Sequence, residues 1–234
     1  MHVEHLSIDG SVVSIEAEAD LTLGATAAGW AVVPSLRRAH PFTIHPAGHS
    51  AVIERAIQGD FEELNVLRTD GFSLKDGELR VAEVEVPTAT DGNRRLTVGA
   101  WEGRSGCLMS SLVGSDRDRL TEMFDTLRFS EGRRGLAIDS PVTARPREPE
   151  VVKEVPGLGV LTIRPAIGSV LDRVPRARGR AVDHGELFRI RATSNALAFI
   201  APSAVVEVTP PPDLDTRQML AVAEGLRVEW SPRA

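Results

Sequence analysis

The chain has 234 residues, of which 42% are hydrophobic and 26% charged, and its formal net charge is -6 at pH 7. This composition is typical of a globular protein with a buried core, and the acidic balance argues against nucleic acid or an anionic membrane as a partner of the whole surface. No apolar stretch approaches the roughly 20 residues that cross a bilayer, so we expect no transmembrane helix.

The cysteine and lysine contents indicate a compartment and an origin. Cys107 is the only cysteine, which excludes an internal disulfide and favours a reducing compartment. The first residues hold no basic segment followed by an apolar run, so no secretory signal is expected. Only Lys75 and Lys153 are lysines in an otherwise arginine-rich chain, a bias typical of high-GC bacterial genomes. The sequence therefore predicts a cytoplasmic bacterial protein.

The N-terminal part of the chain predicts strands joined by turns. Val3–Ile8 and Ser11–Ala17 flank Asp9-Gly10, the strongest short hairpin signal. Further elements, two strands and then two short helices, are expected at Trp30–Pro34, Phe42–His45, Ser50–Gln58 and Asp60–Leu67.

The clearest pattern is an antiparallel meander over Gly71–Val113. Its apolar residues alternate with polar ones, as in strands buried on one face, and turns are expected at Asp76-Gly77 and Asp91-Gly92. The alternation slips by one residue at Ala82-Glu83, which predicts a β-bulge there.

Two stretches of the chain share one design. In Ser115–Phe129 the apolar residues follow the i, i+3, i+4, i+7 spacing of one helix face, and Leu214–Val228 repeats this spacing 99 residues later. Each stretch begins with a capping candidate and ends on Leu-Arg plus a β-former. Each is interpreted as a helix that packs on a sheet and then continues into a short strand.

These elements predict an α+β fold with antiparallel meander sheets, each backed by a helix, in two related sheet-helix-strand halves. Ser140–Pro156 is rich in proline and charge and has no strand or helix period, so it is interpreted as a linker over residues 140–156. It would separate an N-terminal domain, residues 1–139, from a smaller domain, residues 157–234. One core shared by both halves is the alternative.

The meander Gly71–Val113 with its helix, and the shorter echo Glu186–Val228, resemble the α/β sandwich of the PsbP-type family of accessory proteins. In that family a curved antiparallel sheet is backed by helices, and most members are binding or assembly partners. The resemblance therefore implies a binding role and carries over no functional residue.

Histidines gather near the start of the chain. His40, His45 and His49 surround one loop, and with His2 or His5 they would supply the three or four ligands that zinc needs at about 2.0–2.3 Å. Their spacing matches no metal motif, and the prolines between them oppose helical pairing. We therefore assign no metal and no cofactor. A small-molecule or metal-binding protein, or an enzyme that uses the His40–His49 loop, remains the alternative.

No other stretch predicts catalysis. Cys107 has apolar neighbours, which is typical of a buried structural thiol. Gly24–Gly29 has the glycine spacing of a phosphate loop but lacks the lysine and hydroxyl that hold phosphate and Mg²⁺. We therefore assign no catalytic residue and predict that the protein is not an enzyme.

The densest charge feature is a basic loop in an acidic protein, formed by Arg173, Arg176, Arg178 and Arg180. Arginine binds carboxylates and phosphates in a bidentate manner, so the loop can bind an acidic partner. The alternative is a solvated loop whose charges balance neighbouring acids. No aromatic residues alternate with the arginines, which argues against single-stranded nucleic acid.

Together these features favour a non-enzymatic protein-interaction or assembly module, such as an adaptor, an immunity protein or a structural subunit. Its partner is expected to be another protein from the same operon or assembly, with neither nucleic acid nor membrane involved. Exposed sheet edges, or the loop Arg173–Arg180, are the expected contact surface.

Overall fold

The structure is a computed structural model that describes residues 1–33, 38–48, 65–88, 92–139, 145–172, 174, 178–190, 196–211, 214 and 216–233. Strands account for 59% of it and helices for 11%, the described residues holding three short helices. The predicted α+β class is therefore wrong, and the protein is mostly β. The sequence predicted both longer helices, but far more residues lie in strands than in helices.

The chain forms two compact units. The first unit combines Met1–Ala27 with Glu148–Ala234, and the second is Ala28–Arg147. The chain passes between the units on two strands, β3 (Ala25–Val33) and β11 (Arg145–Val155). This division differs from the predicted one, because the first residues belong with the C-terminal part.

Most of the predicted linker is strand β11 rather than a connecting segment. Val151, Lys153 and Val155 alternate on its buried face, each at most 1% exposed. The sequence pattern was missed because a lysine occupies one of the three core positions. The alternation of strand residues is therefore present, but one of its members is charged.

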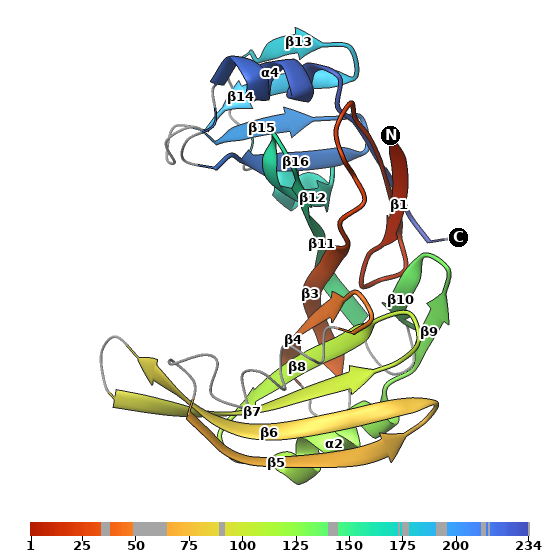
Figure 1. The fold of residues 1–234 in the computed structure, drawn as a ribbon, viewed down its shortest axis with the longest axis vertical. Helices are drawn as coiled ribbons and strands as arrows, with labels where there is room; N and C mark the ends of the chain where they lie inside the picture. The colour runs from red at the N-terminus through yellow and green to blue at the C-terminus, as the bar shows by residue number, and fades with distance from the viewer. Residues whose placement is uncertain are drawn as a thin grey trace. The chain divides into compact units, whose positions relative to one another are not determined.

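In the second unit, hydrogen-bonded strands follow the order β4-β8-β7-β6-β5, and all of these pairs are antiparallel (Figure 1). The elements of this unit after β3 are β4 (Arg38–His45), β5 (Asn65–Leu74), β6 (Gly77–Thr88), β7 (Gly92–Glu102), β8 (Cys107–Val113), α2 (Arg117–Thr126), β9 (Phe129–Gly132) and β10 (Gly135–Ile138). The meander prediction is confirmed by these pairs. Ser50–Gln58 and residues 60–64 lie outside the described residues, and residues 65–67 of the second predicted helix begin β5 instead.

Helix α2 covers β6 and β7 with the face that the sequence pattern indicates. Leu120, Met123 and Phe124 are fully buried, and the Asp116 carboxylate accepts a hydrogen bond from Arg119 N at 3.3 Å as the N-cap. A Cβ at Gly99 of β7 would lie 2.7 Å from Phe124 Cε2, so the helix can approach the sheet this closely only over a glycine.

Two details of the meander correct the sequence interpretation. The register shift lies between Val66 and Arg68 on β5, whereas Ala82 and Glu83 pair regularly. The apolar alternation slips there because Val81 and Ala82 are both buried, one on each face of β6.

The β5–β6 turn is also one residue earlier than predicted. Lys75 and Asp76 form the turn, and Gly77 already pairs with Leu74 in the ladder. A Cβ at Gly77 would lie 2.3 Å from Glu102 O, so this glycine allows a close approach of β7 rather than a turn conformation.

In the first unit, the strand order is β13-β14-β15-β16-β12-β11 (Figure 1). Strands β1, β2 and β17 form a separate three-stranded sheet in the order β1-β2-β17. The elements of this unit, apart from β3 and β11, are β1 (His2–Leu6), β2 (Val12–Glu16), β12 (Gly159–Pro165), α3 (Gly168–Leu171), β13 (Arg180–Val182), β14 (Gly185–Arg189), β15 (Leu197–Ile200), β16 (Ala204–Thr209), α4 (Thr216–Glu224) and β17 (Arg227–Ser231). On β2 and β17 the buried residues Val13, Ile15, Val228 and Trp230 share one face, which leaves a polar face outward. The hairpin predicted around Asp9-Gly10 is confirmed by the β1–β2 pairing.

The two halves are not topological repeats. Both helices continue into a strand, but β9 pairs with its neighbour β10, whereas β17 pairs with β2 from the start of the chain. Ser115–Phe129 and Leu214–Val228 therefore share a sequence pattern because each forms an amphipathic helix followed by a strand, although the two strands belong to different sheets.

Lys75 connects the β5–β6 turn to the C-terminus of α2. Its Nζ donates to Phe124 O at 2.8 Å and to Leu127 O, and it lies 4.6 Å from the centre of the Phe129 ring. A cation is favourable at this end of a helix, where carbonyl groups lack partners. Lys75 itself has a φ of 56°, a left-handed conformation that costs energy for any residue but glycine.

Two variants separate these contributions. Lys75→Ala removes the ammonium and keeps the strained backbone, so we expect the free energy of unfolding to fall by about 1–2 kcal/mol. Lys75→Gly removes the same ammonium but relieves the strain, so it should be more stable than the alanine variant by about 0.5–1 kcal/mol. Urea unfolding followed by tryptophan fluorescence measures both. An alanine variant at least as stable as the glycine variant would show that the left-handed backbone at position 75 stores no strain.

Candidate functional site

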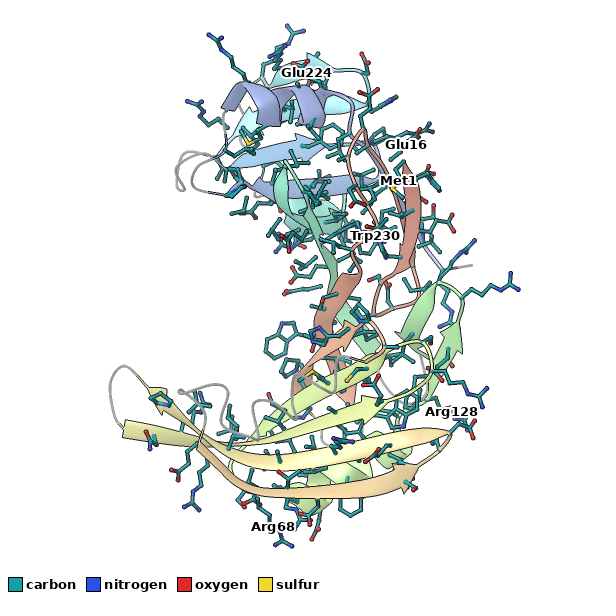
Figure 2. The ribbon with its side chains drawn as sticks, in the orientation of Figure 1. Met1, Glu16, Arg68, Arg128, Glu224 and Trp230 are labelled. Atoms are coloured by element: carbon teal, nitrogen blue, oxygen red, sulfur yellow. The ribbon has the colours of Figure 1, made fainter. Side chains whose placement is uncertain are left out.

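The four predicted arginines have different outcomes. Arg173 and Arg176 lie outside the described residues. Arg178 is exposed and precedes β13, and Arg180 is the first residue of that strand. Arg180 Nη2 lies 2.5 Å from Glu224 Oε1 at the end of α4, the glutamate labelled in Figure 2. Both side chains are largely exposed, so this ion pair contributes little to stability.

Strand β13 is an edge of its sheet. Among the described strands it pairs only with β14, through Arg180↔Leu187, Ala181↔Glu186 and Val182↔Gly185. The turn Asp183-His184 has two residues, so Val182 and Gly185 form the hydrogen-bonded closing pair. Hydrogen-bonded pairs alternate with pairs whose main-chain groups face outward. The N–H and C=O of Ala181 therefore face away from β14.

The tip of this hairpin also lines a pocket of about 700 Å³. Its lining residues come from the β13–β14 turn, the β15–β16 turn and β17, and they are Asp183, His184, Gly185, Pro202, Ser203, Arg227, Val228 and Glu229. The Ser203 Oγ accepts a hydrogen bond from Trp230 N at 2.9 Å, which ties the β15–β16 turn to β17. The pocket mixes both signs of charge, so it suits polar groups of a partner.

A smaller pocket of about 180 Å³ shares Arg227 and Glu229 with the larger one. It opens on the polar face of the three-stranded sheet, where His2, Glu16 and Arg227 form one cross-strand row. Sequence reasoning missed these residues because they come from strands far apart in the chain.

The histidine side chains of the predicted loop do not converge in the described part of the chain. His40 and His45 both lie on β4, five residues apart, and side chains an odd number of residues apart point to opposite faces of a strand. His49 lies outside the described residues. Within the described residues, no group of three or more His, Cys, Asp or Glu side chains is placed to hold a metal ion.

Cys107 is fully buried at the start of β8. Burial and the neighbouring Glu102 carboxylate raise the pKa of its thiol to about 12. Because the thiolate is the nucleophile, this thiol is inert near neutral pH.

The first unit contains two ionisable side chains withdrawn from solvent, one fully buried and one half-buried. Lys153 is 1% exposed, its Nζ donates to Leu23 O, and burial lowers the pKa of its ammonium. His5 on β1 has a buried Nε2 with no hydrogen-bond partner among the described residues. Burial, and then the charge of Lys153, lower the pKa of His5 to about 4. Lys153 therefore lies in the core of the unit, whereas the side chain of His5 is half-buried at its margin.

Comparison with known proteins returned nothing: no family model, curated protein or solved structure matches the chain. The resemblance to the PsbP-type family therefore stays a prediction. In the described residues, no helix has both the length and the apolar character needed to cross a membrane.

The lowered pKa of His5 predicts that the free energy of unfolding depends on pH. In the unfolded chain His5 binds a proton below its ordinary pKa of 6.5, whereas in the folded chain it binds one only near pH 4. The free energy of unfolding should therefore fall as the pH falls from 6.5 to about 4. Lys153 acts in the same sense at alkaline pH, where stability rises up to its ordinary pKa of 10.5. Urea unfolding of wild type and His5→Phe at pH 7, 5.5 and 4 measures the first effect.

We expect His5→Phe to lose much of the difference in stability between pH 7 and pH 4. His2→Gln is the matched control, because His2 lies on the same strand but is exposed. Identical pH profiles for wild type and His5→Phe would show that His5 does not contribute.

Proposed function

We propose that the protein is a non-enzymatic interaction module that binds an extended strand of another protein along the edge of β13. The observation that carries this proposal is the outward-facing main chain of Ala181, three residues after the exposed Arg178. Such an edge binds a further strand by main-chain hydrogen bonds, while neighbouring side chains select its sequence.

The charges beside β13 favour an acidic partner segment. Arg178 and Arg180 present guanidinium groups that bind carboxylates in a bidentate manner. Glu224 already pairs with Arg180, so a partner carboxylate would replace or share this exposed contact. Complementary charge of this kind accelerates association and selects the partner.

The long edge strand of the second unit is less suited to this role. The register shift between Val66 and Arg68 disturbs β5 as a template. Asp70 Oδ2 also forms ion pairs with Arg68 Nε at 3.1 Å and with Arg117 Nη2 at 2.5 Å, so these charges pair within the unit. Bulges and charges are the usual protection of an edge against pairing.

An adaptor, an immunity protein or a structural subunit fits this mode of binding, with a partner from the same operon or assembly. We place the protein in the cytoplasm, because its single cysteine is a buried free thiol with no disulfide role. The inert thiol and the buried Lys153 support a role without catalysis.

One pair of variants tests the edge. Ala181→Pro removes the outward N–H, whereas Ala181→Val keeps it and favours strand structure. A partner captured by the tagged wild-type protein from its own cell lysate should be retained by the valine variant and lost by the proline variant. Circular dichroism and urea unfolding check that both variants fold. A partner that the proline variant captures as well as wild type would contradict binding at β13.

A further inference from the structure

We infer that β13 also pairs with β13 of a second copy of this chain, antiparallel and about a two-fold axis at Ala181. The inference rests on the proposed function, because it uses the same edge, and it names one occupant of that edge. Symmetric pairing of one surface with itself is the commonest arrangement of protein dimers.

The main chain of β13 fits this axis. If Ala181 lies opposite Ala181 of the second copy, the two residues exchange both of their outward-facing hydrogen bonds, as in a hydrogen-bonded antiparallel pair. The next pair of this kind places Gly179 opposite Asp183 of the other copy. Alanine and glycine are small, so no bulky side chain stands at these two positions.

The charges along the edge select the antiparallel orientation. From Arg178 and Arg180 to Asp183, the segment changes from basic to acidic. Antiparallel pairing about Ala181 places Arg178 opposite His184 of the other copy, one residue from its Asp183, so the basic end of each copy lies beside the acidic turn of the other. Parallel pairing would instead place like charges together, which is unfavourable. The sequence of this edge is therefore complementary to itself.

The interface is small, because β13 has only three residues. Interfaces of this size give weak and transient association, so we expect a dissociation constant on the order of 100 µM. Dimer formation and binding of another protein's strand exclude each other, since both use the outward groups of Ala181. Self-pairing would thus protect the edge while no partner is present.

A charge-reversal cycle tests the inference in sedimentation velocity experiments on the full chain, over a concentration range of about 5–500 µM. Arg178 lies opposite His184 of the second copy, one residue from its Asp183, so Arg178→Asp and Asp183→Arg each bring like charges together at the end of the paired strands and should weaken dimerisation several-fold. The double variant Arg178→Asp with Asp183→Arg restores opposite charges and should dimerise as wild type does. Ala181→Pro should abolish the dimer, and Ala181→Val should keep it.

Three results would overturn the inference: a wild-type chain that stays monomeric throughout, a dimer insensitive to both charge reversals, or a double variant as weak as the single ones. The charge variants change exposed residues, so they test the pairing even where the proline variant misfolds. A monomeric chain whose partner capture is still lost in Ala181→Pro would refute self-pairing and leave the proposed function standing. A monomeric chain whose partner capture is unchanged in Ala181→Pro would refute both self-pairing and the proposed function.

Discussion

The first unit depends on contacts that join two segments far apart in the chain. Met1–Ala27 and Glu148–Ala234 form one compact body, so loop closure over the intervening residues has to be compensated by these contacts. Two of them span the gap directly: β2 pairs with β17 along its whole length, and the Lys153 ammonium donates to Leu23 O. The edge β13 belongs to this unit, in a sheet formed by strands of its C-terminal segment.

Both lysines of the chain act on main-chain carbonyl groups, whereas arginine supplies nearly all other positive charge. A guanidinium is planar and wide, but an ammonium is compact and reaches carbonyl oxygens in confined places. Lys75 does this at the C-terminus of α2, and Lys153 does it in the core. The composition bias that suggested only a genomic origin therefore also marks two structural positions.

The sequence predicted those elements whose signal is local. The helix at Ser115–Phe129 and the hairpin around Asp9-Gly10 were found because periodicity and turn chemistry act over a few residues. Strand β11 was missed because Lys153 interrupts its apolar pattern, and the pairing of β2 with β17 has no local signal at all. For the site, Arg178 and Arg180 were found by charge density, whereas Arg227 and Glu229 reach the pocket only through long-range pairing.

In the proposed role, the edge of β13 would bind a partner and still be protected from aggregation because it is short. A long, flat, apolar edge pairs with any strand, but three residues offer few hydrogen bonds, so charge complementarity decides which strand binds. Arg178 and Asp183 supply opposite charges at the two ends of β13, which favours one orientation of an incoming strand. The specificity of strand pairing would then come from repulsion between like charges as much as from the main-chain hydrogen bonds. In the proposed role, the hairpin β13–β14 would thus combine weak main-chain binding with a defined strand orientation.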